Sequence, residues 1–79
     1  MNKQKIARNF MKTRGKSAFR TLIRALEEQR SGQEIGELLG VSRERVRQWR
    51  DTFGQTVSYY QVYPEVRDLV NHIEKQGSP

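Results

Sequence analysis

The sequence SGQEIGELLGVSRERVRQWRDTF, residues 31–53, contains the pattern that decides the fold. Ser31 and Glu34 have the spacing of a capping box, in which serine and glutamate satisfy backbone donors at the start of a helix. Gly40 suits the left-handed backbone that ends a helix, and Ser42 suits the cap of a following one. The pattern therefore predicts two short helices, 32–39 and 43–53, joined by a tight turn.

Two short helices joined by a glycine-containing turn form a helix-turn-helix. Gly36 is placed where the second helix would cross the first closely. Trp49 has an inward register, which favours core packing over base stacking. We expect the following apolar residues to fill the space behind the two helices: Ile35, Leu38, Leu39, Val41, Val46, Trp49 and Phe53.

Apolar residues recur at helical spacing in three more segments. They predict helices over 4–12, over 17–30 with Ser17 as the cap, and over 64–76, and Gly15 separates the first two. We therefore predict an all-α fold, a small bundle of four to five helices with the helix-turn-helix at 32–53, in a single domain over residues 1–79.

Residues 54–63 lack helical periodicity and predict a loop or a short strand. We expect Tyr59, Tyr60 and Tyr63 to pack under the last helix or at a dimer seam, and stacking on a nucleic-acid base is the alternative. The apolar stripe of 64–76 is the candidate seam of a homodimer. The alternative is that this stripe closes the core of a monomer.

Positive charge is concentrated at the N-terminus. The net charge is +6, and residues 1–26 contain eight basic residues and no acidic one. Such a surface suits a polyanion. We predict that residues 1–16 form a basic arm or a short helix that contacts the DNA backbone, and a solvated tail is the alternative. The basic residues assigned to this contact are Lys5, Arg8, Lys12, Arg14 and Lys16.

The outward face of 43–53 carries side chains that can read base edges. Arg43 and Arg47 can each hold guanine with two hydrogen bonds, and Gln48 can pair with adenine; phosphate contact or solvation is the alternative. Glu44 either accepts from cytosine or stabilises the start of its helix. We predict backbone contacts, which make up most protein–DNA hydrogen bonds, for Gln33, Ser42, Arg45 and Arg50.

Residues 34–48, EIGELLGVSRERVRQ, closely resemble the promoter-reading helix-turn-helix of bacterial sigma factors. The resemblance implies that Arg43, Glu44 and Gln48 contact bases of the upstream promoter hexamer, and that Arg47 contacts the backbone or a base. The sequence departs from the family after Gln48 and lacks the other segments of a sigma factor. We therefore expect a free-standing bacterial or phage transcriptional regulator that binds double-stranded DNA in the cytoplasm.

Several classes of function lack support in the sequence. Cysteine is absent and His72 is the single histidine, so we predict no enzyme, no metal site and no cofactor. No apolar run has the length of a membrane span. Two alternatives to a regulator stay open: a DNA-targeting accessory protein of a recombination or phage system, and a factor that docks on RNA polymerase through the C-terminal stripe.

Overall fold

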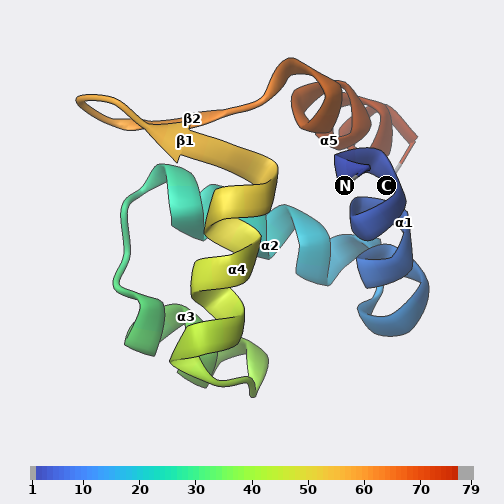
Figure 1. The fold of residues 1–79 in the computed structure, drawn as a ribbon. Coiled ribbons are helices and arrows are strands. Elements are labelled where there is room, and N and C mark those ends of the chain that lie inside the picture. The colour runs from blue at the N-terminus through green and yellow to red at the C-terminus, as the bar shows by residue number, and fades with distance from the viewer. Residues whose placement is uncertain (1, 77–79) are drawn as a thin grey trace.

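The computed structural model describes residues 2–76, in which five helices and one β-hairpin follow one another (Figure 1). The hairpin confirms that 54–63 contains short strands, and the rest is the predicted helical bundle. The elements are α1 (Lys3–Arg14), α2 (Lys16–Glu27), α3 (Gly32–Leu39), α4 (Arg43–Phe53), β1 (Gly54–Thr56), β2 (Tyr60–Val62) and α5 (Pro64–Gln76).

Helices α1 and α2 meet at Gly15 without a linker. The φ angle of Gly15 is +98°, a conformation that glycine adopts without strain. Because α2 begins at Lys16, Ser17 lies inside its first turn, and the prediction that Ser17 caps this helix is wrong. The Ser17 carbonyl instead accepts a hydrogen bond from the Thr21 hydroxyl. The helix also ends earlier than predicted, at Glu27.

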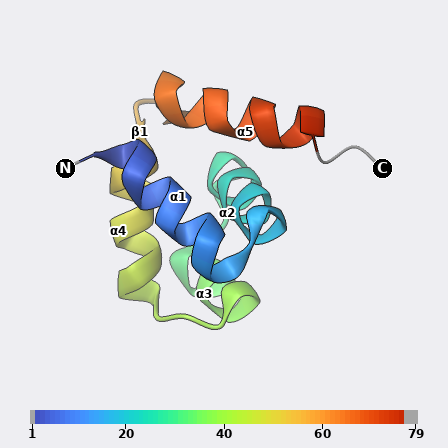
Figure 2. The same cartoon turned by 90° about the vertical axis from the view of Figure 1, so that its right-hand side faces the viewer.

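Edge-to-face aromatic rings join the N-terminal helix to the helix-turn-helix. The ring of Phe10 lies 5.7 Å from that of Phe19 and 4.9 Å from that of Trp49, and Phe19 contacts Phe53 at 5.4 Å. Trp49 is buried, which confirms its predicted place in the core. Figure 2 shows α1 crossing α2 and α4. The basic N-terminal segment is therefore a packed helix and not a free arm.

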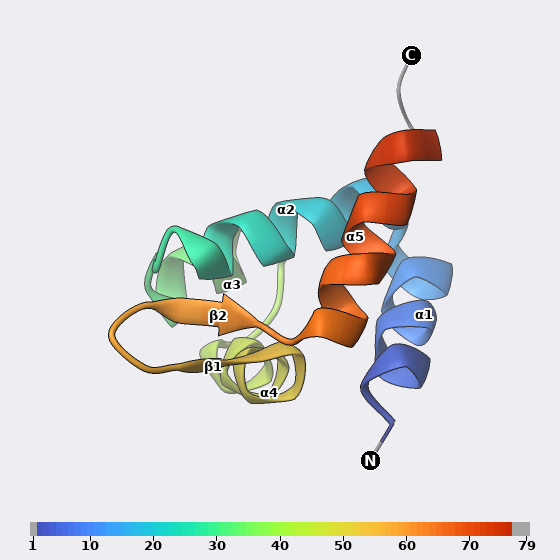
Figure 3. The same ribbon diagram turned by 90° about the horizontal axis from the view of Figure 1, so that it is seen from above.

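Helix α5 turns its apolar stripe inward, against α1 and α2 (Figure 3). Val66, Val70 and Ile73 are all buried. The stripe thus closes the core of a single chain, which is the alternative to a homodimer seam. Its apolar side chains are therefore not available to a second subunit. Ion pairs hold both sides of the helix: Lys3–Glu65, Arg20–Glu74 and Arg67–Glu27.

The hairpin follows α4 directly and is fastened to it. A Cβ atom on Gly54 would lie 2.3 Å from a carbonyl oxygen of the opposite strand, so this close approach requires glycine. The buried Tyr60 donates its hydroxyl proton to the Arg50 carbonyl at 2.7 Å, and burial raises the pKa of this phenol. Tyr60 is therefore buried between the hairpin, α2 and α4, and not under the last helix as predicted, whereas Tyr59 is 56% exposed on the hairpin.

Candidate nucleic-acid interface

Local signals hold the two motif helices at a fixed angle. The capping box is present, because Glu34 N donates to Ser31 Oγ at 3.0 Å and Ser31 N donates to Glu34 Oε1 at 3.4 Å. Gly40 ends α3 in the left-handed conformation with φ +72°. Ser42 then caps α4 by accepting from Arg45 N at 3.2 Å. Each of these contacts was predicted, and together they define where α4 begins.

Close backbone packing sets the distance between the two helices. A Cβ atom on Gly36 would lie 2.7 Å from the Val41 carbonyl oxygen in the turn. Ile35 and Val46 are fully buried behind this contact. The structure thus confirms the role expected for Gly36, since any larger residue would push α3 away from the turn.

The outer face of α4 is exposed along its length. Its inner residues Val46, Trp49 and Phe53 are buried, and this register leaves the following side chains facing solvent: Arg43, Glu44, Arg47, Gln48 and Asp51. The structure therefore brings all four residues predicted to contact bases onto one surface. Asp51 lies on the same surface.

Arg47 is held between two carboxylates on this face. Its guanidinium lies 2.5 Å from Glu44 Oε2 and 3.5 Å from Asp51 Oδ2. The hydrogen bond from Arg47, together with its charge, lowers the pKa of Glu44, and the same contacts raise the pKa of Arg47. The i, i+3 and i, i+4 spacing of these residues is the sequence signal that would have found the cluster.

Arg43 and Gln48 differ from Arg47 in that their side chains are unpaired. Within residues 2–76, neither side chain makes a hydrogen bond or an ion pair. Arg43 lies in the first turn of α4, the part of a recognition helix that usually enters the major groove first. It is thus the exposed arginine on this face that can reach a base without breaking a contact.

A shallow pocket joins the start of α3 to the outer face of α4. Arg50 lines this pocket, is partly buried, and donates to the Arg30 carbonyl at 3.3 Å. Gln33 is exposed in the first turn of α3, next to this pocket. The surface offers several cationic groups and helix-start amides to an anion. The pocket is lined by Gly32, Ser42, Arg43, Glu44, Arg47 and Arg50.

Two further arginines flank the indole ring of Trp49. Arg45 lies 5.7 Å and Arg14 lies 5.6 Å from the ring centroid, both within the range of a cation–π contact. Arg14 also donates to the Leu39 carbonyl at 3.4 Å and so ties α1 to the end of α3. Arg45 is exposed beside the outer face of α4, whereas Arg14 has a structural contact that the sequence did not predict.

The other basic residues predicted to touch DNA lie outside this pocket. Lys5, Arg8 and Lys12 are exposed on α1 at helical spacing, on the side opposite to the buried Ala7 and Phe10. Lys16 is exposed at the start of α2. The structure therefore separates a mixed-charge outer face of α4 from a basic strip on α1.

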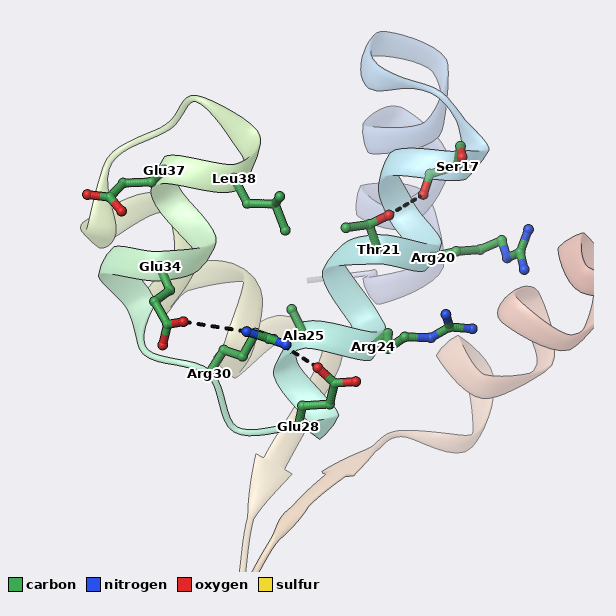
Figure 4. A pocket seen from close by; sticks show the side chains of 10 residues that line it. All are labelled: Ser17, Arg20, Thr21, Arg24, Ala25, Glu28, Arg30, Glu34, Glu37 and Leu38. Carbon is green, nitrogen blue, oxygen red and sulfur yellow. Dashed lines mark hydrogen bonds and ion pairs between the residues drawn. The ribbon is translucent and has the colours of Figure 1, made fainter.

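A second pocket lies between α2 and α3 (Figure 4). Leu38 points into it and is 60% exposed, so the prediction that Leu38 faces inward is wrong. Consecutive side chains of a helix are rotated by about 100°. Leu39 packs against the core, and Leu38 therefore faces away from it. Arg30 bridges Glu28 at 2.8 Å and Glu34 at 3.5 Å beside this pocket. The pocket lining contains three arginines and three glutamates, so it offers nucleic acid no net positive charge.

Between residues 2 and 76, no cluster of three or more histidine, aspartate or glutamate side chains is arranged to hold a metal ion. None of the helices in that range is long and apolar enough to cross a membrane.

A capped, glycine-dependent turn followed by an exposed, arginine-bearing helix defines a helix-turn-helix DNA-binding protein. Residues 18–50, from α2 to α4, match the family Sigma-70, region 4, a helix-turn-helix DNA-binding region of sigma factors. This match confirms the resemblance found in residues 34–48. No curated protein and no solved structure matches the chain.

Proposed function

We propose that the protein is a free-standing transcriptional regulator of a bacterium or phage that binds a specific duplex sequence in the cytoplasm. Helix α4 enters the major groove with its N-terminal end leading. The observation that carries this proposal is the exposed face of α4, where Arg43 and Gln48 are unpaired next to a capped turn.

The residues of this face have different roles in the proposal. Arg43 reads guanine and Gln48 reads adenine, because their side chains have the matching donors and acceptors. Arg47 and Glu44 form an ion pair in the free protein. This pair breaks on binding, and each side chain then contacts a base. Backbone contacts, which position the helix without reading sequence, are assigned to Gln33, Ser42, Arg45 and Arg50.

The basic strip on α1 supplies sequence-independent attraction. Lys5, Arg8 and Lys12 share one exposed side of a helix that is packed on α4. Cations in this arrangement neutralise phosphates and make the affinity depend on salt. Further phosphate contacts are assigned to Lys16, which is exposed at the start of α2, and to Arg14, which lies on the Trp49 side of α1. Discrimination between sequences therefore resides in α4 and general affinity in α1.

The decisive experiment is selection of binding sites from random duplexes, followed by titration of variants. Arg43→Ala should lose about 1–3 kcal/mol of discrimination at one base position, whereas Arg45→Ala should weaken binding to every sequence alike. Arg24→Ala, an exposed arginine of α2 beside the other pocket, is the matched control and should bind as the wild type. Failure to enrich any site, or equal losses for both α4 variants, would contradict the proposal.

We further infer that the regulator binds as a homodimer, because helix-turn-helix proteins commonly read paired half-sites one helical turn apart. With the stripe of α5 occupied inside the chain, the seam must involve other surfaces. The selected sites test the inference through their symmetry, and sedimentation tests it independently. Asymmetric sites bound by a monomer would exclude a homodimer.

Protein docking is a second candidate function, favoured by the exposed side chain of Leu38 in the α2–α3 pocket. An isolated large apolar side chain in a charged pocket suits an apolar anchor of a partner, and RNA polymerase is the partner implied by the sigma-factor resemblance. Binding of purified polymerase that is lost in Leu38→Asp and kept in Arg43→Ala would support this function. Equal binding by both variants would exclude this pocket.

A further inference from the structure

The β-hairpin presents an uncharged face to solvent. Gln55 lies opposite Gln61 in the strand register, and the Gln61 amide donates to the Tyr59 hydroxyl at 3.1 Å. Since side chains alternate along a strand, these three residues share one face and Tyr60 occupies the other. All three are exposed, and residues 54–63 contain no charged residue. We name this surface, formed by Gln55, Tyr59 and Gln61, the hairpin face.

The hairpin is joined to the recognition helix through Arg50. Tyr60 donates to the Arg50 carbonyl at 2.7 Å, while the Arg50 side chain lines the pocket that also contains Arg43 and Gly32. Figures 1 and 3 show the hairpin extending from the C-terminal end of α4 to the side of the molecule where the α2–α3 connection lies. The hairpin therefore begins where the candidate nucleic-acid interface ends.

We propose that the hairpin face binds the DNA sugar-phosphate backbone beside the major groove that α4 enters. In this arrangement the start of α3 contacts one edge of the groove and the hairpin contacts the other. Phosphate oxygens accept hydrogen bonds from amide and hydroxyl side chains, and those are the groups on this face. This inference rests on the proposed DNA-binding function and adds a surface to it.

Two properties favour DNA over a protein partner here. The hairpin carries no carboxylate that would repel phosphates, and it is anchored at Arg50, whose side chain lines the cationic pocket. A stable protein interface buries about 800 Å² on each partner, which a face of three side chains does not supply. A phosphate contact needs only single, well-placed donors.

Neutral contacts of this kind leave a distinct signature in binding. A cation that neutralises a phosphate releases a counterion, so its loss reduces the salt slope of the affinity by about 0.9. A neutral amide or hydroxyl releases none. Loss of the hairpin contacts should therefore weaken binding at every salt concentration by the same factor.

The test uses the full chain, the triple variant Gln55→Ala/Tyr59→Phe/Gln61→Ala, and the duplex selected by the wild type. We expect binding about 10-fold weaker with an unchanged salt slope, given about 2- to 10-fold for each neutral hydrogen bond. Ethylation of phosphates at one edge of the site should impair the wild type and not the triple variant. Asn71→Ala, an exposed polar residue on α5, is the control and should bind as the wild type.

Tyr59→Phe alone removes one exposed hydroxyl and provides a milder variant, and circular dichroism verifies that both variants fold. Unchanged affinity in the triple variant, or a changed ethylation pattern at both edges, overturns the hairpin proposal. If the wild type forms a dimer and the triple variant does not, the hairpin face binds a second copy of the chain, and the hairpin proposal is overturned. If the wild type binds duplex and the triple variant binds equally, the proposed function stands; if the wild type binds no duplex, both fail.

Discussion

Replacement of Gly36 by alanine should open the helix-turn-helix. The added Cβ would lie 2.7 Å from the Val41 carbonyl oxygen, a backbone atom that cannot rotate away. Helix α3 and the turn must then separate by about half an ångström, which loosens the contacts that α3 makes behind it. The shift would change the position of α4, because Ser42 follows Val41 directly and caps that helix.

The size of the effect follows from two opposing contributions. Overpacking of a tight contact costs about 1–3 kcal/mol, and the upper part of this range applies because the obstructing atom is backbone. Alanine in place of glycine in a helix returns about 1 kcal/mol. We therefore expect Gly36→Ala to lower the free energy of unfolding by about 1–2 kcal/mol, and a domain of this size then loses about 5–15 °C in Tm.

Thermal and urea unfolding followed by circular dichroism measure this change. Gly32→Ala is the control, since its Cβ would lie closest to the Arg43 side chain, at 3.0 Å, and would reach the nearest backbone atom only at an ordinary contact distance of 3.8 Å. The control should stay within about 0.5 kcal/mol of the wild type, as surface changes usually do. Equal unfolding midpoints for Gly36→Ala and the wild type would refute the steric argument.

Three further changes test other contacts. Asp51→Asn removes one of the two carboxylates beside Arg47, so we expect tighter binding to random duplex and a smaller preference for the selected site; an unchanged preference in competition binding would show that Asp51 has no part in discrimination. Tyr60 has a raised pKa, so the folded state holds its proton more tightly, and the stability this confers is complete below about pH 10 and is lost as the pH rises further. Tyr60→Phe should cost about 1 kcal/mol at neutral pH, because the Arg50 carbonyl loses its donor, and should show a smaller decline in urea midpoint above pH 10 than the wild type. Gly54→Ala should cost more than about 2 kcal/mol in thermal unfolding, because its Cβ would overlap the opposite strand; wild-type stability would show that the hairpin can shift.

The helix-turn-helix could be predicted from the sequence to the residue, because local contacts set its boundaries. Ser31, Gly40 and Ser42 act on backbone groups within a few positions of themselves. The start of α2 could not be predicted in this way. Ser17 is a residue that commonly caps helices, but the positive φ of Gly15 allows the helix to begin before it.

The outer face of α4 was also predictable, since the inward register of Val46 and Trp49 determines which side chains of the helix face out. The partners of those side chains required more information. The contact of Arg14 with the Leu39 carbonyl joins residues 25 positions apart and depends on how α1 packs. Leu38 was wrongly predicted to face the core, because an apolar side chain in a helix of only eight residues can also line a pocket beside it.

The position of Trp49 has a practical consequence for spectroscopy. It is the single tryptophan of the chain, and its indole lies under the recognition helix with the guanidinium groups of Arg14 and Arg45 near its ring. A phosphate that draws Arg45 away would change the electric field at the indole, while Arg14 would stay tied to α3. The protein thus carries an intrinsic fluorophore whose emission reports on the underside of the helix that is proposed to contact DNA, without any added label.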